Sequence, residues 1–391
     1  MSPGGRALSV VLAGGGSAGH VNPLLALADC LRRHDPQTVI TVLGTAEGLE
    51  ARLVPERGYR LRTVPKVPFP RRPGLGMLRF PGALRGAVAS AAAVLTEVGA
   101  DVVVGFGGYV ATPAYLAARR TGKPIVIHEQ NARPGLANRL GARFTPHVAT
   151  TFAATRLPHA TVVGLPLRQE VADLDRAAAR PEALEHFGLR GDATTLLVSG
   201  GSLGALRLNT AFAGAARDLA GAGMQVLHLT GAGKELEVAD GAQAAGSAAL
   251  PESLPPYRAL PYTDRMELAY AVADLAICRA GAGAVCELSA VGVPAIYVPL
   301  PVGNGEQRLN AADVVAAGGG LLVEDERVTP GWVREEVIPL LGDADRLAAM
   351  GRAAAVMGHR DADDALARMV LAAAGRPGPD PGRPDPDPGR P

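Results

Sequence analysis

Cysteine is scarce in this chain, and the few cysteines present exclude two classes of structure. Cys30, Cys278 and Cys286 are the only three, and none belongs to a C-x-x-C pair. An odd, widely spaced set neither builds a disulfide framework nor supplies a cysteine-rich zinc site, and it indicates a reducing compartment. We expect Cys278 to fill the core of a strand and Cys286 to pack on the helix that follows.

Net charge and long apolar runs are lacking as well. The formal net charge is +1, so nothing indicates a global attraction to nucleic acid. The apolar run at 87–95 is far shorter than the roughly 20 residues needed to cross a bilayer. The stretch at 10–13 is too short for the apolar region of a signal peptide and leads directly into glycines. We therefore expect any membrane contact to be peripheral.

Acidic residues are absent between Arg57 and Thr96, where basic residues are frequent. The basic side chains there are Arg57, Arg60, Arg62, Lys66, Arg71, Arg72, Arg79 and Arg85, and the interleaved apolar ones are Phe69, Leu75, Met77, Leu78, Phe80 and Leu84. Two interpretations stay open. The stretch is either a solvated loop of an arginine-rich protein or a basic and apolar face that contacts anionic lipid headgroups.

Aromatic residues are few, whereas alanine and glycine are abundant, which suits helices packed closely on a parallel sheet. The chain is too long for one ordinary core and long enough for two domains. A strand, a glycine loop and a helix follow one another near the start and again after Thr195, so we predict an α/β fold with two similar halves. The expected strands are 8–13, 38–43, 101–104, 124–127, 195–198, 225–229, 275–278 and 295–298, and the expected helices are 23–33, 113–121, 172–187, 284–291 and 361–373.

The most informative stretch runs from Asp274 to Asn310. Its first part reads as a buried strand at 275–278, a glycine-rich turn at 279–283 and a helix. A tight loop that opens a helix gathers unpaired N–H groups and the positive end of the helix dipole at one point. That point favours a phosphate.

Three polar side chains follow this predicted phosphate site. Glu287 lies about one helical turn further on, where a carboxylate can accept hydrogen bonds from a ribose diol. Gln307 and Asn310 are three residues apart, so they share one helical face, and two neutral amides suit a polyhydroxyl ligand. The stretch therefore predicts a site for a nucleotide and a sugar.

The first glycine loop, 14–19, leads into His20 at the carboxyl edge of the predicted sheet, where open α/β sheets bind ligands. Because histidine titrates near neutral pH, His20 is our candidate general base. The alternative is a histidine that only caps the start of a helix.

Polar residues also end the strand at 124–127, where His128-Glu129-Gln130-Asn131 follows. We expect at least one of the four to contact substrate, and the alternative is a hydrogen-bonded turn. Arg168 can reach a diphosphate. The turn at 262–266 is a plausible contact for a nucleotide base.

Several other site types are excluded. Ahead of the C-terminal tail, D-x-D triplets begin at Asp173, Asp343 and Asp361, in polar helical or turn context, so we expect no metal–diphosphate site and no cofactor. Charge on a leaving group is then neutralised by helix dipoles, hydroxyls and Arg168. The segment 230–235 resembles a P-loop but has His228 where the first glycine is required. The tail at 376–391 contains only Gly, Pro, Arg and Asp, and we expect it to be disordered.

Taken together, six segments closely resemble the MurG family, the bacterial transferases that add N-acetylglucosamine (GlcNAc) to undecaprenyl-diphosphate-linked N-acetylmuramyl (MurNAc) pentapeptide in peptidoglycan synthesis. The segments are 14–23, 105–109, 128–138, 199–209, 262–266 and 278–310. The resemblance implies a GT-B fold, with two Rossmann-like parallel-sheet domains facing a cleft. It implies an acceptor- and membrane-binding domain at 1–168, a UDP-GlcNAc-binding domain at 169–360, and a helix at 361–375 that packs back on the first domain.

The resemblance also implies site residues. UDP-GlcNAc would be bound by Ser17, Ala18, Gly19, Asn131, Arg168, Ser202, Thr263, Ala282, Gly283, Ala284, Val285, Cys286, Glu287, Gln307 and Asn310. The acceptor would meet Gly107, Gly108, Tyr109, His128 and Glu129. Within the donor set, residues 282–286 would meet the phosphates, Glu287 the ribose, Gln307 the sugar and the Thr263 backbone the uracil. The first loop is one residue longer than the Gly-Gly-Thr-Gly-Gly-His form, which leaves the choice between Gly16 and Ser17 open.

The implied activity is that of an inverting hexosyltransferase at the cytoplasmic face of the cell membrane. The acceptor is lipid I, the undecaprenyl-diphosphate-linked MurNAc-pentapeptide, whose C4 hydroxyl attacks the anomeric carbon of UDP-GlcNAc. The 57–86 region would face an anionic membrane. The alternatives are a GT-B transferase acting on a soluble aglycone, a UDP-GlcNAc 2-epimerase and a non-catalytic UDP-sugar sensor. A nicotinamide dehydrogenase is least expected, because both glycine loops lack the dinucleotide spacing.

Overall fold

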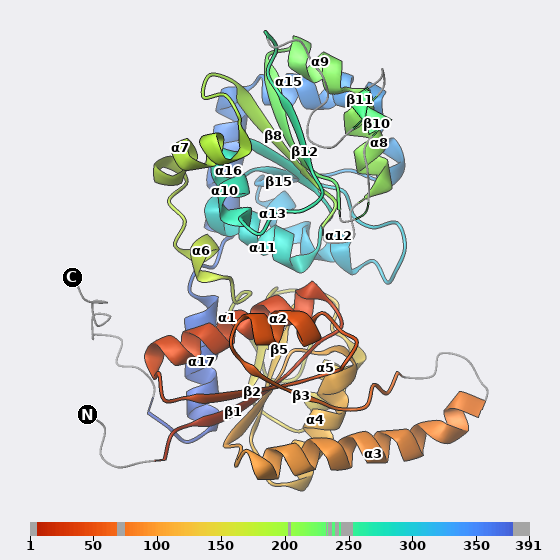
Figure 1. Cartoon of the computed structure of the whole chain (residues 1–391), viewed down its shortest axis with the longest axis vertical. Helices are drawn as coiled ribbons and strands as arrows, with labels where there is room; N and C mark the ends of the chain where they lie inside the picture. The colour runs from red at the N-terminus through yellow and green to blue at the C-terminus, as the bar shows by residue number, and fades with distance from the viewer. Residues whose placement is uncertain are drawn as a thin grey trace. The chain divides into compact units, whose positions relative to one another are not determined.

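The computed structural model describes residues 6–68, 75–201, 205–231, 233, 237–238, 242–243 and 253–377. The chain divides into two compact units, each described separately below (Figure 1). Unit 1 contains Met1–Gln130, Pro134–Pro166 and Asp361–Pro391, and unit 2 contains Asn131–Arg133 and Leu167–Arg360. Among the described residues, no helix is both long enough and apolar enough to span a bilayer. The expected disordered tail lies almost entirely outside the described residues.

Unit 1 is built on a seven-stranded parallel sheet with the order β3-β2-β1-β4-β5-β6-β7. The inner strand β1 is buried along its whole length, because β2 and β4 flank it and helices cover both faces. This is the strand order of the doubly wound dinucleotide-binding folds. The strands are β1 Ser9–Ala13, β2 Val39–Gly44, β3 Arg60–Thr63, β4 Val102–Gly105, β5 Ile125–Glu129, β6 Val148–Thr150 and β7 Ala160–Val162.

Helices cover both faces of this sheet (Figure 1). Alternate β1 side chains point to opposite faces, so Val10 and Leu12 pack with α1 and α17 whereas Val11 and Ala13 pack with α3 and α4. The helices of unit 1 are α1 Ala18–His34, α2 Glu50–Glu56, α3 Leu75–Glu97, α4 Gly108–Arg120, α5 Leu136–Gly141 and α17 Ala362–Ala373.

The last helix, α17, is part of unit 1 although it follows unit 2 in the chain. Leu366 and Val370 join the apolar cluster that contains α1. Beside this contact, Asp364 Oδ1 accepts hydrogen bonds from His34 Nε2 at 2.7 Å and Cys30 Sγ at 3.2 Å. Arg33 pairs with Asp363 at 2.7 Å. Apolar burial and charged hydrogen bonds together hold α17 against α1.

Unit 2 repeats this architecture with a six-stranded parallel sheet in the order β12-β9-β8-β13-β14-β15. The first strand of the unit, β8, is again an inner strand. The strands are β8 Thr194–Ser199, β9 Met224–Leu229, β12 Tyr257–Leu260, β13 Leu275–Cys278, β14 Ala295–Tyr297 and β15 Gly320–Leu322, with a separate antiparallel pair of β10 Glu237–Val238 and β11 Ala242–Gln243.

The helices of unit 2 again lie on both faces of the sheet (Figure 1). They are α6 Gln169–Ala172, α7 Arg176–Phe187, α8 Leu206–Gly214, α9 Ala216–Gly221, α10 Met266–Val272, α11 Ala282–Val291, α12 Glu306–Asn310, α13 Ala312–Ala316, α14 Pro330–Trp332, α15 Ile338–Leu341 and α16 Ala344–Val356, with a 3-10 turn at Asp325–Arg327 and a π-helical segment at Val333–Val337.

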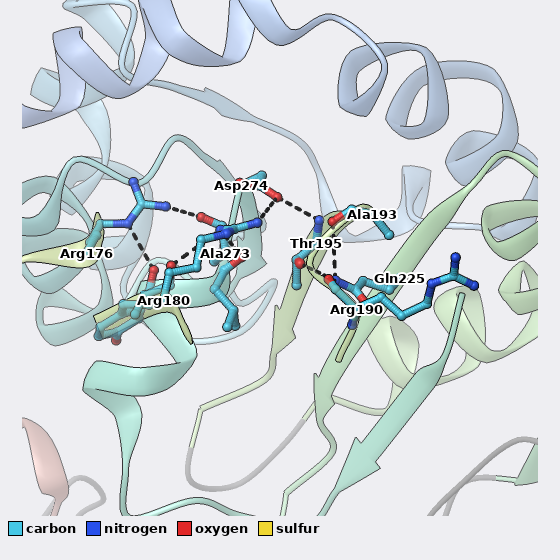
Figure 2. Close-up of polar contacts among 11 residues, drawn as sticks. Arg176, Arg180, Arg190, Ala193, Thr195, Gln225, Ala273 and Asp274 are labelled. Atoms are coloured by element: carbon cyan, nitrogen blue, oxygen red, sulfur yellow. Dashed lines mark hydrogen bonds and ion pairs between the residues drawn. The ribbon is translucent and has the colours of Figure 1, made fainter. Parts of the chain in front are cut away.

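Arginine side chains form hydrogen bonds at the amino end of the second sheet (Figure 2). Arg176 donates to the carbonyls of Tyr270 and Ala273, which are left without partners where α10 ends. Arg180 Nη2 donates to Asp274 Oδ2 at 3.1 Å, and the same oxygen accepts from Thr195 N at 2.8 Å (Figure 2). A cavity of about 740 Å³ lies beside these residues, at the edge of the sheet opposite the loops that carry the candidate site.

The expected α/β fold with two similar parallel-sheet halves is confirmed, but several element boundaries were wrong. Helix α1 begins at Ala18, so Pro23 lies in its second turn, not its first. Helix α4 begins at Gly108 instead of Pro113, and α11 begins at Ala282 instead of Ala284. Strand β5 continues through His128 and Glu129, which pair with β6. The long helix α3 and the short strand β3 were not expected at all.

Candidate active site

Both units place their candidate residues at the same position in the topology. In unit 1 the strand order reverses direction between β1 and β4, and in unit 2 it does so between β8 and β13. Ligands of open α/β sheets bind outside the carboxyl ends of the strands at such a reversal. The loops there are 14–17 and 106–107 in unit 1, and 200–205 and 279–281 in unit 2, where residues 202–204, including the predicted Ser202, lie outside the described part.

The N-terminus of α11 has the features of an anion site. Its N-cap is Gly281, no side chain caps it, and its first turn holds no acidic residue. A Cβ added at Gly281 or Gly283 would meet no atom within 4 Å, so the space beside the turn is open. Neither glycine has a positive φ. They therefore leave room for a ligand, and a sharp turn does not require them.

Glu287 lies on α11, and its carboxylate interacts with the neutral Tyr270 hydroxyl and with the positive charge of Arg168. Its Oε2 accepts a hydrogen bond of 2.5 Å from Tyr270 OH. Burial raises the pKa of Glu287 above its ordinary value, while the positive charge of Arg168 and the Tyr270 hydrogen bond oppose the rise. Arg168 Nε is buried and has no hydrogen-bond acceptor in the described part of the chain. A buried guanidinium donor without a hydrogen-bond acceptor among the described residues, close enough to Glu287 to affect its pKa, is suited to binding an anion.

The two predicted amides of α12 differ in their surroundings. Gln307 is partly exposed, and its Oε1 accepts from Leu300 N at 3.0 Å, which turns its NH2 group away from that backbone. Asn310 is buried; its Oδ1 accepts from Ala132 N at 2.9 Å, and its Nδ2 donates to Asn131 Oδ1 at 3.3 Å. Asn310 thus positions residues 131–132, whereas Gln307 keeps donors for a ligand.

Thr263 follows the β12 strand, where its backbone was expected to meet uracil. The residue is buried, and its Oγ accepts from Arg265 N at 3.1 Å. This bond fixes the turn at 262–265 without using the Thr263 backbone donor. The predicted contact through that backbone stays a prediction.

His20 lies in the first turn of α1, and Ser17 is the N-cap of that helix. His20 Nδ1 and Ser17 Oγ are 2.9 Å apart, and the Ser17 side chain does not cap the helix backbone. When Nδ1 carries the proton and donates to Ser17, Nε2 has a free lone pair, as a general base requires. Burial lowers the pKa of His20, although the Glu50 carboxylate and a hydrogen bond with the Gly15 backbone act in the opposite direction.

Two glycines between β4 and α4 allow a second loop to approach His20. Gly107 has φ +90, and a Cβ there would lie 3.2 Å from His20 Nε2. Gly108 has φ +77, and a Cβ there would lie 2.7 Å from the Gly15 carbonyl oxygen. Both positions therefore require glycine for conformation and for space. Tyr109 follows; the residue is 44% exposed, and Lys66 Nζ lies 5.5 Å from the centroid of its ring.

The predicted acceptor residues His128 and Glu129 are fully engaged within unit 1. His128 is buried; Nε2 bonds the Gly164 carbonyl at 2.9 Å and Nδ1 bonds Gln130 at 3.0 Å. Burial lowers the pKa of His128 to about 4, against the hydrogen bond to Gly164, which raises it. Glu129 Oε2 accepts from Gly135 N at 3.0 Å and Asn138 Nδ2 at 2.9 Å. This bonding favours the hydrogen-bonded turn, and an acceptor contact by these two side chains stays a prediction.

Acidic residues from outside the 57–86 region neutralise part of it. Arg57 pairs with Asp29 at 3.4 Å, and Arg62 Nη2 donates to Glu97 at 2.7 Å, with Arg60 nearby at 3.7 Å. The exposed Lys66, Arg79 and Arg85 are in no ion pair among the described residues. Phe69, Arg71 and Arg72 lie outside the described part, as do the side chains of Leu75, Met77 and Leu78. Among the described basic side chains, those outside ion pairs are therefore the ones available to a membrane, and contact with a membrane stays a prediction.

Glu50 was not identified from the sequence. Its carboxylate is completely buried and accepts a hydrogen bond from Gly16 N at 2.8 Å, under the first glycine loop. The two residues are 34 positions apart, and no short motif joins them. Tyr270 was likewise not identified, since it approaches Glu287 from the preceding helix.

Comparison with known proteins adds an independent line of evidence. Residues 10–150 match the model of the Glycosyltransferase family 28 N-terminal domain, and residues 195–366 match that of the C-terminal domain. A relative from Leifsonia xyli subsp. xyli (strain CTCB07) is 56% identical over 367 residues, which is 93% of this chain and 99% of the relative. It is named UDP-N-acetylglucosamine--N-acetylmuramyl-(pentapeptide) pyrophosphoryl-undecaprenol N-acetylglucosamine transferase. The chain belongs to the MurG family.

Further members of the MurG family agree with this assignment. A relative of the same name from Streptomyces avermitilis is 56% identical over 366 residues, covering 94% of this chain and 98% of its own. The crystal structure of MurG from Acinetobacter baumannii is 28% identical, with a TM-score of 0.74 over 93% of this chain and 99% of that one. The predicted GT-B fold and the resemblance to the MurG family are both confirmed.

Proposed function

We propose that this chain is a hexosyltransferase that moves GlcNAc from UDP-GlcNAc to the C4 hydroxyl of MurNAc in undecaprenyl-diphosphate-MurNAc-pentapeptide, converting lipid I to lipid II in peptidoglycan synthesis. Relatives that are 56% identical over nearly their full length carry the name of this transferase. We assign the acceptor to the domain at 1–168, the donor to the domain at 169–360, and a packing role on the first domain to the helix at 361–375.

One observation carries the donor site: the uncapped α11 start lies on the same helix as Glu287, whose charge environment includes Arg168. In the proposal, the N–H groups of residues 282–286 and the unpartnered Arg168 Nε bind the diphosphate. The free oxygen of Glu287 accepts from the ribose. Gln307 binds the sugar through its NH2 group, and the Thr263 backbone meets the uracil. These groups stabilise the charge of the departing UDP by preorganised dipoles.

His20 is the proposed general base. Nε2 takes the proton of the acceptor C4 hydroxyl while the hydroxyl oxygen forms the new bond to the anomeric carbon. The bond from that carbon to UDP breaks, and UDP leaves with the electron pair, so the anomeric configuration inverts to β. Ser17 holds Nδ1, which keeps Nε2 available. No step requires a metal ion or an added cofactor.

The same proposal includes peripheral attachment to the cytoplasmic face of an anionic membrane, where the lipid-linked acceptor resides. Its basis is the exposed set of Lys66, Arg79 and Arg85 on and before α3. Headgroup attraction contributes about 1 kcal/mol for each basic residue near the surface.

Transfer from UDP-GlcNAc to a short-chain lipid I analogue, assayed with EDTA present, tests the proposal. We expect a β-linked disaccharide product and undiminished turnover with EDTA. Turnover of UDP-GlcNAc without acceptor would instead indicate the 2-epimerase, and transfer to soluble aglycones only would indicate the other GT-B class. The His20→Ala variant should lose roughly 100-fold or more in kcat while the donor KM stays near its original value. Full kcat in that variant would remove His20 as the base.

A further inference from the structure

Glu50 is a charged side chain with no access to water. It opens α2, its exposed fraction is 0%, and it has no cationic partner among the ion pairs of the described residues. Its charge is met by three donors instead. Oε2 accepts from Gly16 N at 2.8 Å, and Oε1 accepts from Thr45 N and Thr45 Oγ, each at 2.8 Å. Burial raises the pKa of Glu50, but these hydrogen bonds outweigh it and leave the pKa below its ordinary value.

The backbone around this carboxylate is shaped to admit it. A Cβ added at Gly15 or Gly48 would overlap the carboxylate oxygens, and one added at Gly44 would overlap Cγ. Gly16 adopts φ +87, a left-handed turn in which its N–H points down to Oε2. Three glycines from two loops thus enclose one carboxylate. The arrangement is an anion cradle made of one backbone N–H group from each of two loops and one hydroxyl, with the anion supplied by the chain itself.

The turn that Glu50 holds leads directly to His20. Gly16 precedes Ser17, which occupies the N-cap position of α1 and bonds His20 Nδ1 at 2.9 Å. The Gly15 carbonyl, in the same turn, meets the Gly108 backbone, and Gly107 faces the imidazole. A change in the Gly15–Gly16 turn therefore moves both the ring and the loop that it faces.

We propose that Glu50 is a positioning residue for His20: its buried carboxylate fills the anion cradle under the first glycine loop and so fixes the imidazole in the orientation that the base requires. The inference rests on the proposed role of His20. It also means that Gly16 N is already bonded and does not donate to a substrate.

Charge is the second way in which Glu50 acts on His20. Its negative charge raises the pKa of His20 against the lowering effect of burial. Of the other elements beside the ring, the β4–α4 loop presents Gly107, and α5 presents the neutral amide of Asn138. Behind that amide lie Glu129 and Tyr115, both hydrogen-bonded to it. Beyond Gly108, Tyr109 stands with Lys66 over its ring.

The substitutions Glu50→Gln and Glu50→Asp separate charge from position. Glutamine keeps the shape of the Glu50 side chain and removes its negative charge. Its NH2 group must face either the Gly16 N–H or the Thr45 donors, and the donor that it faces loses its hydrogen-bond acceptor. Aspartate keeps the charge but is one methylene shorter, so it cannot reach both loops. Glu56→Gln is the matched control, because Glu56 is an exposed carboxylate at the other end of the same helix, paired with Arg52.

NMR titration of the His20 ring and steady-state kinetics give the readouts. In Glu50→Gln we expect the His20 pKa and the acid limb of the kcat–pH profile to move to lower pH, because the charge that favoured imidazolium is gone. The plateau of kcat should fall roughly tenfold or more, a loss of about 1.4 kcal/mol in transition-state stabilisation. The donor KM should change far less than kcat, since Glu50 bonds residues of unit 1 and none of the donor residues of unit 2. Glu50→Asp should keep the His20 pKa near its original value and still lose kcat.

The results that overturn the inference are specific. Unchanged His20 titration and unchanged kcat in Glu50→Gln, matching Glu56→Gln, would show that Glu50 has no influence on the ring. If Glu50→Gln does not fold, Thr45→Val is the second variant, because it removes one of the three hydrogen-bond donors to Glu50. We expect Thr45→Val to lower kcat a fewfold. A normal kcat in that variant would also refute the inference. If His20→Ala retains activity, the proposed base fails, yet the NMR titration still reports whether Glu50 controls the His20 ring.

Discussion

Glu287 is the residue at which the donor site can be tested most directly. Its carboxylate holds Tyr270 with one oxygen and has the other available for the ribose. Replacing Glu287 with alanine removes a charged hydrogen-bond acceptor, which is worth about 1.5–3 kcal/mol. We expect the KM for UDP-GlcNAc to rise by roughly one to two orders of magnitude with a smaller change in kcat.

Tyr270→Phe provides the control for that measurement. This variant frees the second carboxylate oxygen without removing the charge, so its donor KM should change far less. An unchanged KM in Glu287→Ala would remove Glu287 from the ribose. Calorimetric titration with UDP alone gives the same comparison without turnover.

The residues that the sequence could identify are those whose chemistry is local. Glu287 and the first turn of α11 follow from one strand–loop–helix motif, and the structure places them on one helix. His128 and Glu129 were expected at the end of a strand, but β5 continues through them, so both are buried. Glu50 could not be found, because Gly16, 34 residues away, meets it only when β1 and β2 pair in the sheet.

At the scale of elements, the most specific prediction concerns the turn that leads from β4 into α4. Gly108→Ala places a methyl group at φ +77 and brings Cβ to 2.7 Å from the Gly15 carbonyl oxygen. The left-handed conformation alone costs about 1–2 kcal/mol for an alanine. We expect a lower melting temperature and a lower kcat, because the first glycine loop must move. Thermal unfolding and transfer kinetics measure the two effects.

Gly86→Ala is the matched control for this change. Gly86 lies within α3, where an added Cβ meets no atom within 4 Å. Alanine is favoured over glycine in a helix by up to about 1 kcal/mol, so this variant should be as stable as the original or more so. Equal behaviour of the two variants would mean that the contact between the loops does not constrain the site.

Strands were easier to predict than helices for a physical reason. A parallel strand covered on both faces, such as β13 Leu275–Cys278, is a short apolar run that few other elements produce. Strand β3 is at the sheet edge and contains Arg60 and Arg62, so it lacks that signal. Helix α3 was missed because Pro81 and several arginines near its start are typical of a loop, although the helix extends from Leu75 to Glu97.

For the whole molecule, the prediction concerns binding to lipid. Removing two exposed basic residues, with Arg79→Ala and Arg85→Ala together, should weaken partition onto anionic vesicles by roughly 30-fold, at about 1 kcal/mol for each residue. Arg327→Ala with Arg334→Ala is the control, because it removes the same charge from unit 2. Vesicle sedimentation at low and high salt measures both, and the donor KM should stay constant. Equal binding of the two double variants would argue against the basic face.

The position of α17 has a consequence for the order in which the chain can fold during synthesis. The ribosome releases all seven strands of the first sheet early, yet the helix that covers α1 is translated only after the whole of unit 2. Until then the apolar surface around Leu24 and Leu27, which Leu366 and Val370 later join, lacks its final cover. The nascent N-terminal half therefore lacks the apolar contacts of α17 until the last helix has been translated.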